Sequence, residues 1–198
     1  ARFDARNTGI NSFQVRSYDE FVQRVGEADV VSVSGMWKND IIPHAMRLKF
    51  IQSISSGMDQ YSKELLGAKG IRLASAAGVN AEAVAEHAMA LILALARRLP
   101  EARDNQHAKN WRGMIGDPAQ REDELQGKTM LIVGLGGIGG RLAQIAKAFD
   151  MKVIGTRRDP SKGAGGADEV FADADLVKVL PRADFVVLTC PITPETTN

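Results

Sequence analysis

The segment Thr129–Arg158, TMLIVGLGGIGGRLAQIAKAFDMKVIGTRR, has the pattern of a strand, a glycine turn, a helix and a second strand. Its first five residues, Thr129–Val133, form a short apolar run that stops at a glycine, which is typical of a buried strand. Apolar residues then recur at helical intervals from Ile138 to Phe149. This order predicts a βαβ unit of a parallel sheet, and the rest of the chain can be placed around it.

The turn inside this unit carries Gly134, Gly136 and Gly139 at the G-x-G-x-x-G spacing. The first glycine allows a tight turn, the second lets backbone amides approach a pyrophosphate, and the third lets the helix pack closely on the strand. A chain with 19 glycines can produce such a spacing by accident, as part of a purely structural turn. Because a strand precedes the turn and a helix follows it, we interpret the segment as a dinucleotide site. The free N–H groups and the dipole at the helix start favour an anion there.

The end of the second strand indicates which dinucleotide is bound. An NAD site usually has Asp or Glu about 20 residues beyond the glycines, where the carboxylate accepts hydrogen bonds from the ribose. This chain has Thr156, Arg157 and Arg158 there, and Asp159 lies beyond that position. A guanidinium binds a 2′-phosphate, whereas a carboxylate repels it. We therefore expect NADP rather than NAD; the alternative is that the two arginines are a solvated surface pair.

The composition of the chain limits which classes of protein it can belong to. The chain of 198 residues is 44% hydrophobic and 25% charged, and its net charge of +1 without a basic run argues against nucleic-acid binding. Its single cysteine, Cys190, suits a reducing compartment, so we expect a cytoplasmic protein. The most apolar run, Ala88–Ala96, is too short to cross a bilayer. We expect neither a membrane segment nor a metal site.

Strand-like and helix-like pieces alternate along residues 1–79, with a weaker strand pattern at 12–15, which predicts a second parallel α/β sheet. Small residues around 76–80 indicate a boundary, so we expect domains 1–79 and 80–198. The helix expected at 81–99 is apolar nearly all round, and it should be buried against another domain or another subunit.

Several pieces of the chain resemble the D-isomer-specific 2-hydroxyacid dehydrogenases. The matching pieces are Gly35–Trp37, SSGMD at 55–59, GVNAEAVAEHAMALILALARR at 78–98, the stretch 125–155 and DFVVLTCPITPETTN at 184–198. The resemblance implies a flavodoxin-like parallel α/β substrate domain and a doubly wound Rossmann domain, both incomplete here. It also implies a homodimer formed through helix 81–99 and the loop after it. The Thr-Arg-Arg ending is most similar to the NADP-using glyoxylate and hydroxypyruvate reductases, which act on small 2-oxo acids.

The resemblance also suggests site residues. It implies that the backbone around Ser56, Gly57 and Met58 holds the substrate carboxylate, and a turn of small residues after a strand is indeed a good anion-binding nest. Met36 and Trp37 either wall the substrate pocket or belong to the core. The resemblance assigns the pyrophosphate to Gly136, Gly137 and Ile138, and the nicotinamide-ribose and adenosine side to Cys190, Pro191 and Thr196.

The resemblance places the family's catalytic Arg, Glu and His after the C-P-x-T-P-E-T piece, beyond Asn198. We therefore expect no catalytic residue within this chain, and we expect the chain to be part of a longer enzyme. A second hypothesis uses the same scaffold without significant turnover: a dinucleotide-sensing protein, similar to the family's corepressor members, in which cofactor binding controls association with a partner.

Overall fold

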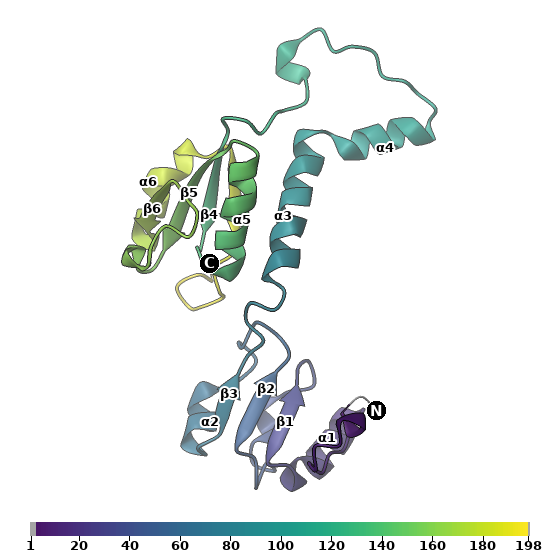
Figure 1. Ribbon diagram of the computed structural model, residues 1–198, viewed down its shortest axis with the longest axis vertical. Helices are drawn as coiled ribbons and strands as arrows, with labels where there is room; N and C mark the ends of the chain where they lie inside the picture. The colour runs from purple at the N-terminus through teal and green to yellow at the C-terminus, as the bar shows by residue number, and fades with distance from the viewer. Residues whose placement is uncertain (1–2, 198) are drawn as a thin grey trace. The chain divides into compact units, whose positions relative to one another are not determined.

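The computed structural model describes residues 3–197 and shows an α/β chain with two parallel sheets (Figure 1). The α/β fold class expected from the sequence is confirmed. The chain divides into two compact units, Ala1–Ala77 and Gly78–Asn198, and each is described by itself. The strands are β1 Val30–Val33, β2 Phe50–Ser53, β3 Arg72–Ala74, β4 Thr129–Val133, β5 Lys152–Arg157, β6 Glu169–Ala172 and β7 Phe185–Leu188. The α-helices are α1 Tyr18–Arg24, α2 Lys63–Ala68, α3 Ala81–Ala96, α4 Leu99–His107, α5 Gly137–Ala148 and α6 Leu176–Val179.

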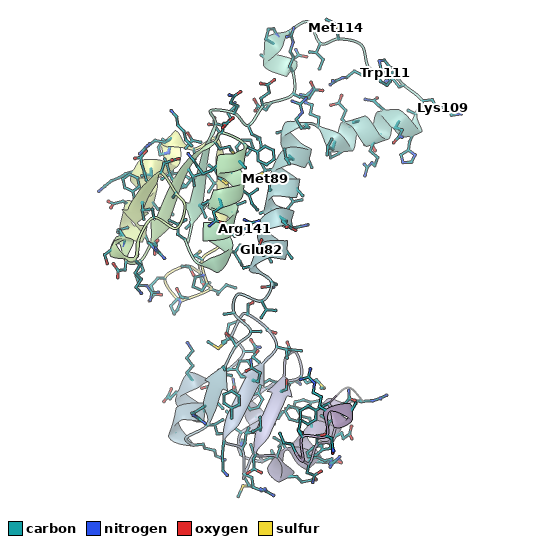
Figure 2. All side chains as sticks on the ribbon, viewed as in Figure 1. Glu82, Met89, Lys109, Trp111, Met114 and Arg141 are labelled. Carbon is teal, nitrogen blue, oxygen red and sulfur yellow. The ribbon has the colours of Figure 1, made fainter. Side chains whose placement is uncertain are left out.

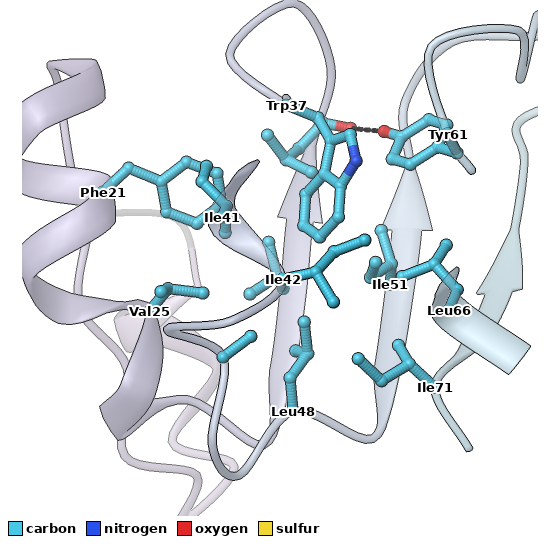
Figure 3. Packing of buried hydrophobic residues seen from close by; sticks show 13 residues of the cluster. Phe21, Val25, Trp37, Ile41, Ile42, Leu48, Ile51, Tyr61, Leu66 and Ile71 are labelled. Atoms are coloured by element: carbon cyan, nitrogen blue, oxygen red, sulfur yellow. Dashed lines mark hydrogen bonds between the residues drawn. The ribbon is translucent and has the colours of Figure 1, made fainter. Parts of the chain in front are cut away.

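The first unit is built on a parallel sheet of order β1-β2-β3. Its core gathers the inward side chains of the strands and of the segments between them (Figure 3). Trp37 lies between two other aromatic residues, with its ring centroid 5.4 Å from that of Tyr61 and 6.3 Å from that of Phe21. The Tyr61 hydroxyl donates to the Val33 carbonyl at 3.3 Å, so this buried polar group is satisfied. Residues 12–15 form no strand and are mostly exposed, contrary to the sequence pattern.

The second unit is built on a parallel sheet of order β6-β5-β4-β7. Strand β4 is central, and the side chains of Met130, Leu131 and Ile132 are fully buried because helices cover both faces. Helices α3 and α5 pack side by side on the face of Met130 and Ile132, whereas α6 packs through Val179 on the face of Leu131.

The order of the strands in this sheet determines where a ligand can bind. The chain runs outward from β4 through β5 to β6 and returns on the other side of β4 as β7. The connections therefore diverge between β4 and β7, and open parallel sheets bind their ligands outside the carboxyl ends of the strands at such a switch point.

Helix α3 has two contrasting faces. Ala85, Met89, Ile92 and Ala96 recur at helical spacing and are buried on the α5 side, with Met89 between the two helices (Figure 2). The opposite face carries exposed apolar residues that no described element of the unit covers. The chain then turns at Arg98, whose φ of +50° is left-handed, into an arm of residues 99–124 that begins with α4 and leads towards β4 (Figure 1).

Within residues 3–197, no helix combines the length and the apolar character needed to cross a membrane. The described residues also contain no group of three or more His, Cys, Asp or Glu side chains that could hold a metal ion.

Candidate functional site

The fingerprint turn joins the end of β4 to the start of α5 at the carboxyl edge of the second unit's sheet. Gly134 has a φ of +101°, and a Cβ placed there would lie 2.7 Å from the backbone nitrogen of Cys190. Both the left-handed conformation and the close approach of the β7 loop therefore require glycine at this position. The amides of Gly134 and Leu135 donate to the Thr156 carbonyl at 3.0 and 3.1 Å, which ties the turn to β5.

The other two glycines of the fingerprint face different surroundings. A Cβ on Gly139 would overlap the Gly134 carbonyl oxygen and would lie 2.8 Å from Thr189 Oγ1, so no larger residue fits between helix and strand. A Cβ on Gly136 would meet no atom within 4 Å. The turn is thus closed on its protein side and open over Gly136, as a bound pyrophosphate requires.

The start of α5 can accept an anion. Its first hydrogen bond runs from the Gly140 amide to the Gly136 carbonyl at 2.8 Å. The amides of Gly137, Ile138 and Gly139 come before that bond and have no acceptor among residues 3–197. These N–H groups and the positive end of the helix dipole suit a phosphate group. The residues present therefore fit the pyrophosphate of a dinucleotide.

Helix α3 begins beside this anion site. A Cβ on Gly137 would lie 3.8 Å from the Cβ of Ala81, the first residue of α3. One turn into α5, Arg141 Nε lies 2.6 Å from Glu82 Oε2, an ion-pair contact without hydrogen-bond geometry (Figure 2). Glu82 thus neutralises a cation that the helix dipole would otherwise disfavour near the start of α5.

The loop after β7 closes over the turn. Thr189 Oγ1 donates to the Gly134 carbonyl at 2.6 Å, and its amide donates to the Val133 carbonyl at 2.9 Å. Sequence reasoning missed Thr189 as a site residue, although a hydroxyl-bearing residue at the carboxyl end of a strand beside β4 was a usable signal. Cys190 is half-buried, and its backbone lies against Gly134.

Pro191 and Thr196, two further predicted site residues, are joined to each other. Thr196 Oγ1 donates to the Pro191 carbonyl at 2.8 Å and accepts the Thr193 amide at 2.8 Å. The Thr196 side chain therefore holds the loop closed, and Pro191 lies exposed beside Cys190.

The predicted residues at the end of β5 have three different environments. The Thr156 side chain is fully buried and its Oγ1 has no hydrogen-bond partner, so it supports the turn through its carbonyl and does not reach the surface. Arg157 is half-buried and donates to the carbonyls of Leu135 and Gly163, at 2.8 and 2.6 Å. Arg158 is exposed. Of the two arginines predicted to bind the cofactor, Arg157 thus has its guanidinium held by backbone carbonyls, whereas Arg158 extends from the surface.

Asp159 is the carboxylate nearest to the end of β5 along the chain. Its Oδ1 accepts the hydroxyl of Ser161 at 2.6 Å and the Ser161 amide at 3.1 Å, and these hydrogen bonds lower the pKa of the carboxyl. Asp159 thus caps the short helix Pro160–Lys162. Its engagement there weakens the case for a carboxylate that binds the ribose hydroxyls of NAD.

The substrate candidates lie in the first unit. Ser56, Gly57 and Met58 follow the carboxyl end of β2, and the amides of Gly57 and Met58 have no acceptor among the described residues. Trp37 is in the core, with 3% of its surface exposed, and its indole N–H donates to Asn39 Oδ1 at 3.2 Å. Of the two alternatives considered for Trp37, a pocket wall or the core, the structure therefore shows the core. A side chain buried in this way cannot wall an open pocket. Met36 packs partly buried against the same core.

The structure thus brings together the second-unit candidates at one edge: the fingerprint turn, the end of β5 and the loop after β7. Each is held by hydrogen bonds to another of the three. The arrangement provides free amides for a pyrophosphate and an exposed cation beyond the end of β5.

Comparison with known proteins identifies this unit. Residues 89–198 match the family model described as D-isomer specific 2-hydroxyacid dehydrogenase, NAD binding domain. The chain is 34% identical to D-3-phosphoglycerate dehydrogenase of Methanocaldococcus jannaschii, over 90% of this chain and 34% of that protein. It is 33% identical to hydroxypyruvate reductase of Thermotoga maritima, over 90% of this chain and 56% of that protein.

The fold is also similar to solved structures. An acyclic imino acid reductase (Bsp5), solved with NADPH and D-Arg, has a TM-score of 0.80 and 25% identity, and the match covers 98% of this chain and 62% of that one. D-lactate dehydrogenase of Aquifex aeolicus, solved with NAD and lactic acid, has a TM-score of 0.74 and 28% identity, over 88% and 52%.

The chain therefore spans from about a third to somewhat over half of the length of these curated relatives. Its second unit carries a nicotinamide-dinucleotide-binding domain, because the family model that covers most of the unit is one. With that model matched over more than half of its residues, the chain belongs to the D-isomer specific 2-hydroxyacid dehydrogenase family.

Proposed function

We propose that the second unit binds NADP(H) and that the whole protein reduces a small 2-oxo acid of the glyoxylate or hydroxypyruvate type. The observation that carries the cofactor proposal is the exposed cation Arg158 beyond the end of β5, where a carboxylate would mark NAD. One further finding supports it: Asp159 is engaged by Ser161.

In this proposal each part of the chain has a distinct role. The amides of Gly137 and Ile138 bind the pyrophosphate, and the backbone of Cys190 and Pro191 lines the cofactor beyond it. In the first unit, the amides of Gly57 and Met58 bind the substrate carboxylate. When bound there, the cofactor would supply a hydride to the keto carbon, and the keto oxygen would take a proton from a general acid. We do not propose any histidine of the described residues as this general acid.

Titration of the protein with NADPH and NADH, followed by nucleotide fluorescence, tests the cofactor proposal. A charge-assisted hydrogen bond to the 2′-phosphate contributes about 1.5–3 kcal/mol, so NADPH should bind roughly 10–150-fold more tightly. Equal affinities would contradict NADP specificity. Turnover of the protein that contains this chain, with a panel of 2-oxo acids, separates the reductase from the sensing alternative: binding without turnover would favour the sensor.

We also propose that the protein is a homodimer through α3 and the arm, residues 99–124. The supporting observation is the outward face of α3, where Leu91 and Leu95 are exposed, together with Trp111 and Met114 on the arm (Figure 2). Exposed apolar residues on both elements favour an interface. A cytoplasmic location is proposed as well, on the grounds of the single reduced cysteine.

A further inference from the structure

Arg157 joins two segments that both belong to the candidate cofactor site. Its Nη2 donates to the carbonyl of Leu135, inside the fingerprint turn, at 2.8 Å. Its Nη1 donates to the carbonyl of Gly163, in the loop after β5, at 2.6 Å. A guanidinium is planar and rigid, so two such bonds fix both its position and the orientation of its plane.

The loop that Arg157 holds packs against the side of the fingerprint turn and of α5. Gly163, Gly165 and Gly166 all have left-handed φ values, of +90°, +56° and +92°. A Cβ on Gly165 would lie 3.6 Å from Leu135 Cβ, and a Cβ on Gly166 would lie 3.4 Å from Ala143 Cβ. The loop therefore rests on the fingerprint turn and on α5.

Because this loop is rich in glycine, it has few side chains and can bury little apolar surface to hold itself in place. Glycines also lose more conformational freedom on ordering than other residues do. The two hydrogen bonds from Arg157 are thus a substantial part of what keeps the loop against the turn.

The environment of Arg158 differs from that of Arg157. It is exposed, and no hydrogen bond or ion pair is found for it among residues 3–197; its charge is one of the causes that lower the pKa of Glu195, in the loop after β7. Its guanidinium is free to bind a phosphate with paired hydrogen bonds, whereas that of Arg157 would have to release backbone carbonyls first.

We propose a division of labour between the two arginines. Arg157 is a positioning residue that clamps loop 163–166 to the fingerprint turn and so shapes the site for either dinucleotide, and Arg158 is the residue that discriminates NADPH from NADH. This inference rests on the proposed cofactor function, which it deepens by assigning specificity to one of two adjacent cations.

Dissociation constants for NADPH and NADH, measured on the same variants, test this assignment. Arg157→Gln should weaken both cofactors by the same factor, roughly tenfold, and leave their ratio unchanged. Arg157→Lys keeps one donor group and should recover part of that loss for both. Arg158→Gln should lower the NADPH to NADH preference by roughly tenfold. Arg182→Gln, which removes an exposed arginine paired with Glu169 near the opposite edge of the sheet, is the control for loss of charge.

Limited trypsin digestion without cofactor tests the clamp independently. Cleavage after Lys162, next to the clamped Gly163, reports opening of the loop. Arg157→Gln should accelerate this cleavage several-fold, by about an order of magnitude at most, whereas Arg158→Gln should leave its rate unchanged.

The outcomes test the division of labour between the arginines separately from the proposed cofactor function. If Arg157→Gln shifts the NADPH to NADH ratio, or if Arg158→Gln does not, the division of labour is overturned. If the wild-type protein binds neither dinucleotide, the proposed function fails, and the digestion still decides whether Arg157 clamps the loop. Should Arg157→Gln not fold, Arg157→Lys and the ratio measured for Arg158→Gln decide the question.

Discussion

The fingerprint turn and the arm of residues 99–124 both connect packed elements of the second unit, yet their side chains meet opposite surroundings. The turn is enclosed by this chain: the loop after β7 covers Gly134, and Leu135 is buried against β5. On the arm, the large side chains of Trp111 and Met114 are 97% and 98% exposed. The structure of the turn is therefore explained by contacts within the chain, whereas the apolar residues of the arm are not.

The arm is nevertheless held in place by polar contacts. Arg112 pairs with Glu122 and lies 4.0 Å from Glu101, so it connects the two sides of the arm. Arg97 donates to the Asp123 carbonyl at 3.0 Å where the arm rejoins α3. Polar contacts thus fix the course of the arm and leave its apolar side chains uncovered. A fixed course combined with uncovered apolar side chains is what an interface element should show. The contrast between the enclosed turn and the exposed arm can be tested by substitutions in each of them.

The largest effect is expected at the closed side of the turn. Gly139→Val should destabilise the protein by about 3 kcal/mol or more, because its side chain would overlap the Gly134 carbonyl and Thr189 Oγ1. Urea unfolding measures this change. Gly136→Ala is the matched control: its Cβ meets no protein atom, so stability should change by about 1 kcal/mol or less, while nucleotide affinity falls. Equal destabilisation by both variants would contradict the closed and open sides of the turn.

The second prediction concerns the outward face of α3. Leu95→Asp should convert the homodimer into a monomer, because it places a charge in the proposed apolar interface, and should raise the dimer dissociation constant roughly 100-fold. Leu95 is 72% exposed within this chain, so the unfolding free energy of the monomer should change by only about 0.5 kcal/mol.

Sedimentation velocity of the protein measures this dissociation. Ile92→Asp, on the buried face of the same helix, is the contrasting variant and should prevent stable folding. A wild-type protein that is monomeric at micromolar concentration would refute the interface and leave the exposed residues of the arm without an explanation.

The sequence predicts the fold well where local patterns and contacts agree. The βαβ unit was recognisable because Met130–Val133 is continuously apolar and because the fingerprint glycines stand at positions where Gly134 and Gly139 leave no room for a side chain and Gly136 is open. Helix α3 was also recognisable, but its apolar composition concealed which face is buried. The neighbours of a helix decide that, and in this case α5 covers Met89 and Ile92.

The details of the site were harder to predict. Arg157 and Arg158 are adjacent and chemically identical in the sequence, and only the folded loop after β5 shows that Leu135 and Gly163 engage one of them. The glycines of that loop carry no sequence pattern of a packed element, yet their left-handed conformations let the loop pack on α5. Trp37 follows a strand, as a pocket residue would, but the rings of Phe21 and Tyr61 place it in the core.

The third prediction tests whether polar contacts hold the arm. Arg112→Gln should increase amide hydrogen exchange in residues 108–124 roughly fivefold, because it removes the contacts with Glu122 and Glu101. Exchange in the fingerprint turn should not change. Arg103→Gln removes an exposed pair with its neighbour Asp104 and serves as the control. Unchanged exchange in the arm would mean that its course depends on the partner subunit instead.

The smallest effect is expected at the ion pair that ties α5 to the start of β5, at the far end of the helix from the turn. Asp168 binds Lys147 Nζ at 2.7 Å and accepts the Val153 amide at 2.8 Å, and these contacts lower the pKa of its carboxyl, with the Lys147 hydrogen bond as the largest cause. Both side chains are substantially exposed, so Asp168→Asn should cost only about 0.5–1 kcal/mol at neutral pH.

The sign of its pH dependence follows from the direction of that pKa shift. A carboxyl with a lowered pKa in the folded state stabilises the protein fully above its unfolded pKa of about 3.9, and this contribution disappears as the pH falls through the folded pKa. The unfolding free energies of wild type and Asp168→Asn should therefore differ at pH 7 and converge as the pH falls below the folded-state pKa of Asp168. Asp175→Asn, which removes a solvated i,i+3 pair with Lys178, should show a smaller difference at pH 7. A gap between wild type and Asp168→Asn that persists at low pH would assign the effect to the Val153 hydrogen bond and not to the charge.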